Sequence, residues 1–210
     1  MSNSQVGTYK FEAFPFHLDV RGKLSMGVLG KHLLNCADAY AAERGFDVVE
    51  QGGEHYTWVL SRLAIELEDL PSCHESFSIQ TWVENVYRLF ADRNFVICDK
   101  DEKPIGYVRS VWAMISMETR NPANLLALYG DRITNSICEK ECPIAKPGRI
   151  KVSQQEAVSE YVAKYSDLDI NGHVNSIKYI EHILDIFPLD IYKKKALKRF
   201  EIAYVAESYY

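Results

Sequence analysis

The heptapeptide DINGHVN at residues 169–175 decides the fold, because DVRGKLS at residues 19–25 has the same pattern of residue types. Each begins with Asp and a β-branched residue, has Gly at its fourth position, and ends on a basic, an aliphatic and a small polar residue. Apolar residues at helical spacing follow both heptapeptides, which predicts a helix after each one. We therefore interpret the chain as two diverged copies of one unit, separated by 150 residues between Asp19 and Asp169.

The segments around the two heptapeptides are typical of an α+β fold. In the first copy, Ser25 is the expected N-cap of a helix that Gly45 ends, and the polar stretch 99–104 is an expected turn. Alternating apolar residues predict strands at 9–18, 56–67, 75–86, 93–99 and 105–116. The second copy repeats part of this order, with a strand at 157–169, a helix at 177–187 that Pro188 ends, and a strand at 197–210.

Three segments follow from this repeat. Residues 1–120 form the first unit, residues 121–150 are a connector without sustained periodicity, and residues 151–210 form the second unit. The second unit is much shorter than the first, so part of its sheet is missing from the pattern. Because a helix on half a sheet leaves an apolar face and strand edges exposed, we expect the natural protein to continue past residue 210.

Composition argues against several classes of protein. A net charge of −5 and a pI near 5.7 disfavour a general nucleic-acid-binding protein. The chain has no apolar run long enough to cross a membrane, no signal peptide pattern and an odd number of cysteines, so we expect a soluble cytoplasmic protein without membrane insertion. Cys138, Cys142, Cys73 and His74 do not match the spacing of a zinc site, and no glycine-rich phosphate loop occurs, so we expect no metal and no cofactor.

The second heptapeptide carries the residues best suited to catalysis. On an extended segment, alternation places the side chains of Asp169, Asn171 and His173 on one side. The amides at the start of the following helix lie nearby, and we assign Gly172 and Val174 to the backbone that faces substrate and stabilises an oxyanion. Such a group would polarise a carbonyl and orient a water molecule.

A purely structural reading of the same heptapeptide is equally open at this point. Asn175 or Ser176 would then cap the helix, Gly172 would make the turn, and His173 would pack against its neighbours.

Two separated segments resemble the acyl-acyl carrier protein thioesterases of plants and bacteria. DLDINGHVNSIKYIEHILDIFP at 167–188 is similar to the active-site segment of that family, which has Asp-x-Asn-x-His-Val-Asn and then a Tyr-Ile helix ending in Pro. SVWAMISMETR at 110–120 is similar to a strand of its first domain. The resemblance implies a tandem double hotdog, in which a long helix is wrapped by an antiparallel sheet twice. It also implies hydrolysis of fatty acyl-acyl carrier protein to free fatty acid, which ends chain elongation.

The resemblance also assigns roles to individual residues. It places the catalytic Asp, Asn and His of the family at Asp169, Asn171 and His173, and a glutamate at Glu207. Ser208 stands where the family has a cysteine, which favours direct attack by water with Glu207 as general base over a cysteine nucleophile. The first copy has Arg and Lys in place of Asn and His, so it is expected to be structural or substrate-binding.

The expected partner is an acyl carrier protein with a fatty acyl chain. Acyl carrier proteins are strongly acidic, so a basic cluster could dock one, although a solvated linker is the simpler alternative. The cluster consists of Lys193, Lys194, Lys195, Lys198 and Arg199. Trp58, Trp82 and Trp112 are core residues or, alternatively, line an acyl tunnel. An acyl-CoA thioesterase and a non-catalytic acyl-binding hotdog protein are the alternative functions, and a homodimer is one option for the oligomeric state.

Overall fold

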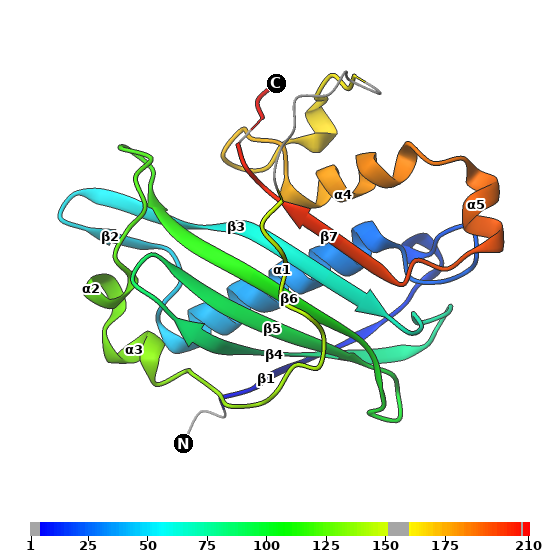
Figure 1. Ribbon diagram of the computed structural model, residues 1–210, viewed down its shortest axis with the longest axis horizontal. Helices are drawn as coiled ribbons and strands as arrows, with labels where there is room; N and C mark the ends of the chain where they lie inside the picture. The colour runs from blue at the N-terminus through cyan, green and yellow to red at the C-terminus, as the bar shows by residue number, and fades with distance from the viewer. Residues whose placement is uncertain (1–4, 151–159, 207) are drawn as a thin grey trace.

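The computed structural model describes residues 5–150, 160–206 and 208–210, and consists of an antiparallel sheet curled around one long helix (Figure 1). The strands are β1 (Gly7–Glu12), β2 (Val49–Gln51), β3 (Glu54–Leu67), β4 (Ser76–Val86), β5 (Phe90–Cys98), β6 (Pro104–Ser116) and β7 (Arg199–Ala203). The helices are α1 (Met26–Arg44), α2 (Leu125–Tyr129), α3 (Asp131–Thr134), α4 (Ser176–Asp185) and α5 (Leu189–Lys194), with 3-10 turns at Pro15–His17 and Tyr165–Asp167.

Helix α1 has the start and the end that its sequence predicts. The Ser25 hydroxyl accepts a hydrogen bond from the Val28 N–H at 3.4 Å, and Gly45 ends the helix with φ of 69°. Gly serves here because a positive φ strains residues that carry a Cβ. The helix is buried on the face that the spacing predicts, and this face includes Leu29, Leu33 and Tyr40.

The sheet has the strand order β1-β4-β5-β6-β3-β2, with neighbouring strands antiparallel. The strands predicted at 56–67, 75–86, 93–99 and 105–116 are confirmed as β3 to β6, with small differences at their ends. Their inward-facing apolar residues pack against α1 and form the main core. These elements make the α+β hotdog arrangement of the first copy.

The second copy extends this sheet. Strand β7 pairs with β3 so that Ala64 lies opposite Glu201, and α4 packs against α1. Two glycines of α1 permit the close approach: a Cβ on Gly30 would lie 2.6 Å from Ile177 Cδ1, and one on Gly27 would overlap the Glu181 carboxylate. The helices of the two copies therefore touch where α1 has no side chains.

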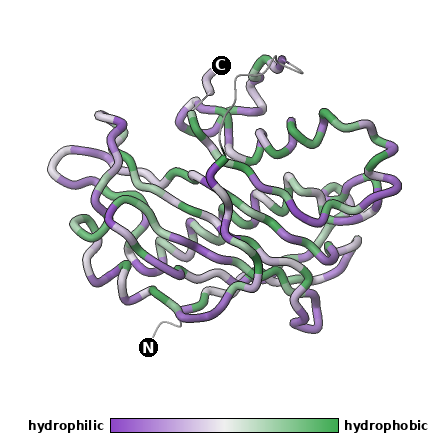
Figure 2. The backbone as a smooth tube through the Cα atoms, viewed as in Figure 1, coloured by the Kyte–Doolittle hydropathy of each residue, from purple (hydrophilic) through white to green (hydrophobic). Residues whose placement is uncertain are grey.

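Several predicted boundaries were wrong. The described part of the stretch predicted as a strand at 157–169 contains a 3-10 turn and no strand, and the last strand covers only Arg199–Ala203. The basic stretch after Pro188 begins with a short helix, α5, that the sequence pattern did not predict. Large apolar residues at the end of α4 and the start of α5 are exposed, including Ile186 just after α4 at 55% and Leu189 at 51%. Figure 2 shows the hydrophobic colour along the stretch that joins these helices.

The connector crosses the outer face of the sheet, opposite α1 (Figure 1). Its backbone accepts hydrogen bonds from two side chains of the sheet, Trp82 Nε1 to Lys140 O at 2.9 Å and Arg109 Nη2 to Cys142 O at 2.6 Å. Cys142 and Ile144 bury apolar surface against Trp82. The connector therefore covers the outer face, and it also contains the two short helices α2 and α3.

The contact between α1 and α4 generates the first prediction. We expect Gly30→Val to destabilise the protein by about 2 kcal/mol or more, because the added atoms overlap Ile177, which is 1% exposed. Ala42→Val, at an exposed position of the same helix, is the control for the lower helix propensity of Val. It should lower the free energy of unfolding by less than about 1 kcal/mol. Urea denaturation of both variants checks this; equal losses would show that the helices do not pack at Gly30.

Candidate active site

The DINGHVN segment is a tight turn and not the extended segment that its alternation suggested. Asp169 Oδ1 accepts hydrogen bonds from the backbone N–H groups of Asn171 at 2.8 Å and His173 at 3.1 Å. The Asp169 N–H in turn donates to the His173 carbonyl at 2.8 Å, and Gly172 has φ of 77°. The Asp169 carboxylate therefore shapes the backbone of the loop, and the expectation of an extended segment was wrong.

The first copy contains the same turn. Asp19 Oδ1 accepts from the N–H groups of Arg21 at 2.8 Å and Lys23 at 3.3 Å, and Gly22 has φ of 71°. Its two basic side chains are occupied locally, since Arg21 pairs with Asp19 at 2.8 Å and Lys23 pairs with Asp69 at 2.9 Å. The repeated Asp and Gly thus specify a turn in both copies. The other residues of the turn differ, and in the first copy Arg21 and Lys23 form ion pairs.

The amides near Gly172 and Val174 are already bonded within the protein. The Gly172 N–H donates to the Asp169 carbonyl at 3.1 Å, and the Val174 N–H donates to the Ser208 carbonyl at 2.9 Å. Asn175 is the N-cap of α4, with its Oδ1 accepting from the Ile177 N–H at 2.9 Å. The capping and turn-forming roles are confirmed, and an oxyanion at this site would rely on side-chain donors more than on these two amides.

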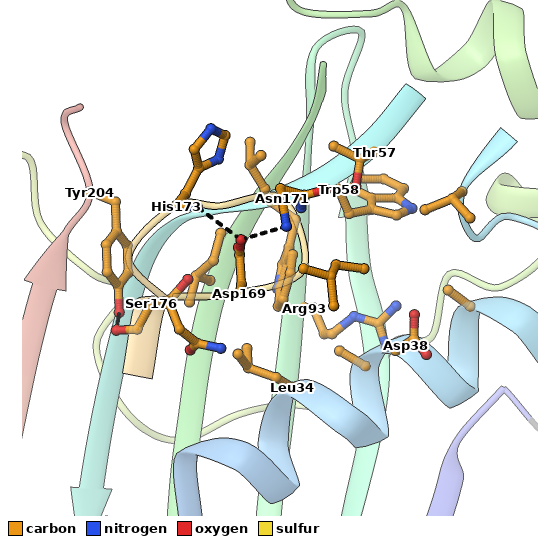
Figure 3. A pocket seen from close by; sticks show the side chains of 18 of the residues that line it. Leu34, Asp38, Thr57, Trp58, Arg93, Asp169, Asn171, His173, Ser176 and Tyr204 are labelled. Carbon is orange, nitrogen blue, oxygen red and sulfur yellow. Dashed lines mark hydrogen bonds between the residues drawn. The ribbon is translucent and has the colours of Figure 1, made fainter. Parts of the chain in front are cut away.

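Residues of both copies line a cavity of about 520 Å³ (Figure 3). Its walls are α1, the inner face of the sheet and the DINGHVN loop, with side chains that include Leu34, Trp58, Trp112, Arg93, Asp169, Asn171 and His173. Trp58 and Trp112 line this cavity, whereas Trp82 is fully buried in the core on the outer face of the sheet. Trp82 is therefore a core residue, and Trp58 and Trp112 line the cavity.

Two tyrosines of this cavity were not recognised in the sequence. The Tyr204 hydroxyl donates to the Ser176 carbonyl at 2.9 Å, and burial raises the pKa of Tyr204. The Tyr179 ring lies edge-on to it at 5.8 Å, and the buried Tyr179 hydroxyl has no hydrogen-bond partner within the described residues. The position of Tyr179 in the helix after the motif is typical of a core residue. Only the structure shows that it lies beside the cavity and that its hydroxyl is a hydrogen-bond donor that the described residues leave unused.

The chain end lies against the motif. The His173 ring packs edge-on against Tyr209 at 4.8 Å, and the Ser208 carbonyl is bonded to Val174, as described above. Ala206 lines the cavity. Glu207, the expected general base, lies outside the described residues.

The basic cluster is only partly available to a partner. Arg199 forms ion pairs with Glu66 and Glu201, and the Lys198 ammonium donates to the Glu68 carbonyl at 3.1 Å. The other members, Lys193, Lys194 and Lys195, are exposed, and Lys193 contacts Asp190 at 3.4 Å. They lie at the end of α4 that is remote from the motif loop (Figure 1).

The part of the chain that the structure describes has neither a metal-binding cluster nor a membrane-spanning helix. No group of three or more His, Cys, Asp or Glu side chains in this part of the chain is arranged to hold a metal ion. None of the helices described above is long and apolar enough to span a membrane.

Comparison with known proteins identifies relatives for both copies. Residues 5–130 match the acyl-ACP thioesterase N-terminal domain, and residues 150–210 match the acyl-ACP thioesterase C-terminal domain. A chloroplastic palmitoyl-acyl carrier protein thioesterase of Gossypium hirsutum is 25% identical over 180 residues, which cover 82% of this chain and 44% of that protein. A chloroplastic oleoyl-acyl carrier protein thioesterase 2 of Arabidopsis thaliana is 28% identical, over 73% of this chain and 44% of that protein. The chain thus spans less than half the length of these curated relatives.

Solved structures agree with this assignment. The crystal structure of an acyl-ACP thioesterase from Bacteroides thetaiotaomicron has 61% sequence identity and a TM-score of 0.90, covering 98% of this chain and 83% of that chain. The 12:0-ACP thioesterase from Umbellularia californica, at 17% identity and a TM-score of 0.80 over 98% of this chain and 79% of that chain, shares the fold. The chain belongs to the acyl-ACP thioesterase family.

Proposed function

We propose that the protein hydrolyses the thioester of fatty acyl-acyl carrier protein and releases the free fatty acid. The observation that carries this proposal is the cavity of about 520 Å³, which is lined mainly by apolar side chains and has the DINGHVN loop in its wall. An acyl chain would lie along Trp58 and Trp112, with its thioester beside Asn171 and His173. Release of acid from a ladder of acyl-acyl carrier proteins, measured beside the matching acyl-CoA series, tests both the reaction and the donor.

The chemistry needs a polarised carbonyl and an activated water. The side chains of Asn171 and His173 are the donors we assign to the carbonyl oxygen, since the neighbouring amides are bonded internally. Glu207 takes a proton from water, whose oxygen bonds to the acyl carbon. The carbon–sulfur bond then breaks, and the carrier thiol receives a proton. Asp169 acts on this reaction through the loop that it shapes.

The loop residues give the most direct test. We expect Asn171→Ala and His173→Ala each to lower kcat/KM by about 100-fold or more, because each removes a positioned donor. Asp169→Ala should cause a similar loss by releasing the two N–H groups that its carboxylate holds. Steady-state hydrolysis of one acyl-acyl carrier protein measures all three.

The first copy supplies the matched controls. Arg21→Ala and Lys23→Ala should leave kcat/KM within a few-fold, since both side chains are engaged in ion pairs away from the reaction. Larger losses from these changes than from those at Asn171 and His173 would place the active half in the first copy and contradict the assignment.

Glu207 and Ser208 distinguish a water mechanism from a serine nucleophile. We expect Glu207→Gln to abolish nearly all turnover, because the amide cannot accept the proton of water. Ser208→Ala should retain most activity, because the contact of Ser208 with Val174 uses the backbone carbonyl and survives the change. Rapid-quench mass spectrometry should find no acyl-enzyme. An acyl adduct on Ser208, together with an inactive alanine variant, would establish a serine nucleophile instead.

Docking of the carrier protein is tested separately. Reversing Lys193, Lys194 and Lys195 to Glu should raise KM for acyl-acyl carrier proteins and not for small thioesters, with an effect that shrinks as salt rises. Lys100→Glu with Lys103→Glu, which reverses two exposed lysines in the turn between β5 and β6, is the control for charge reversal elsewhere on the surface. Because α5 lies remote from the loop, an equal response of both substrates would remove the docking role from this cluster.

A further inference from the structure

Arg93 is a charged residue on the inner face of the sheet, where its neighbours are apolar. It lies in the middle of β5, and the residues two positions before and after it, Ala91 and Phe95, belong to the hydrophobic core. Arg93 itself is only 6% exposed. Its side chain reaches from the sheet toward α1 and forms part of the cavity wall (Figure 3).

No carboxylate of the described residues forms an ion pair with this guanidinium, in contrast to other arginines of the protein. Arg109 pairs with Glu84 at 2.8 Å and Arg21 with Asp19 at 2.8 Å. Arg93 has a long hydrogen bond from Nη1 to Thr81 Oγ1 at 3.4 Å and stacks on the Tyr40 ring with its Cζ 4.6 Å from the centroid. A guanidinium has five N–H donors, so most of its capacity is unused inside the protein.

The charge persists in spite of burial. Desolvation lowers the pKa of Arg93 to about 10, which still leaves the side chain protonated near neutral pH. A buried charge without a partner is costly, and replacing such a group by an apolar one of similar size is often neutral or stabilising. Packing therefore gives no reason for Arg at this position, whereas a ligand that enters the cavity does.

We propose that Arg93 selects acyl chains that carry a hydrogen-bond-accepting oxygen, a hydroxyl or a keto group, at a position removed from the thioester. The proposal rests on the proposed function for the identity of the occupant as an acyl chain. A neutral oxygen is favoured over a carboxylate because it accepts from the guanidinium without requiring desolvation of a second charge. A plain hydrocarbon chain would leave the donors unpaired, and a site built to bond an oxygen discriminates against the analogue that lacks it.

Binding of free acids tests this without turnover. Titration calorimetry compares a saturated acid with acids of equal length that carry a hydroxyl or keto group at successive positions. The wild-type chain should prefer at least one oxygenated acid by roughly 10- to 100-fold, the effect of one buried hydrogen bond to a charged group. Arg93→Met should lose that preference, and Arg93→Lys, which lacks the fork of donors, should retain only part of it.

Arg109→Met is the matched control, because Arg109 lies on the next strand but on the outer face and is ion-paired. It should lower Tm and keep the preference, whereas Arg93→Met should not lower Tm. Equal affinity of the wild-type chain for plain and oxygenated acids at every position would overturn the proposal, as would a lowered Tm or failure to fold of Arg93→Met. A different result would separate the two proposals. If the chain prefers an oxygenated acid but hydrolyses no acyl-acyl carrier protein, the proposed hydrolysis is wrong and the role of Arg93 in selecting oxygenated chains is still supported.

Discussion

The pairing of β7 with β3 is the contact on which the candidate site depends, because it holds the loop of the second copy beside the cavity of the first. Phe200 and Ile202 of β7 face inward and join the core around α1. Burying two such side chains stabilises by roughly 1.5–3 kcal/mol each, whereas the partly exposed ion pair of Arg199 with Glu66 adds about 0–1 kcal/mol. The second copy is therefore held mainly by apolar burial, and the glycines of α1 let α4 approach from the same side.

The two copies show how one turn serves two purposes. The Asp carboxylate and the glycine with positive φ fix the backbone in both, so neither residue by itself distinguishes a catalytic loop from a structural one. The distinction lies in the residues between them. Arg21 and Lys23 are neutralised by nearby carboxylates, while Asn171 and His173 contribute to the cavity wall. The two copies therefore share the backbone frame of the turn and differ in the side chains that it carries.

Much of the first copy could be predicted because local signals agree there. Ser25, Gly45 and the apolar spacing of α1 all indicate the same helix, and the long strands alternate strongly. The prediction of a strand before Asp169 was wrong because a short apolar run is compatible with a strand and with other structures. The structure has a 3-10 turn there, at Tyr165–Asp167. The prediction of an extended conformation for the DINGHVN loop was wrong for a different reason. The alternation of its residues favours an extended segment, but the preference of Asp and Gly for turns is the stronger effect here.

The site could be predicted only as far as its motif. Asp169, Asn171 and His173 are close in sequence, and all three line the cavity. Arg93 and Tyr179 could not be found in this way, because their significance depends on what surrounds them in three dimensions. An arginine in a strand normally reads as an outward-facing residue, and only the register of β5 shows that this one faces α1.

The polar groups around Arg93 explain why its charge is not part of an internal network. The Thr81 hydroxyl donates to the Asn94 carbonyl at 3.0 Å, and the Ser110 hydroxyl donates to the Arg93 carbonyl at 2.9 Å. Ser110 also accepts from Trp112 Nε1 at 2.8 Å, which orients the indole that lines the cavity. These neighbours satisfy the backbone and one another, and among the described residues they offer the guanidinium a single long contact at Thr81. A buried network that gives a charged group a single long hydrogen bond is expected to be less stable than an apolar core. Its presence in the wall of a cavity is consistent with a site in which some stability is given up for recognition.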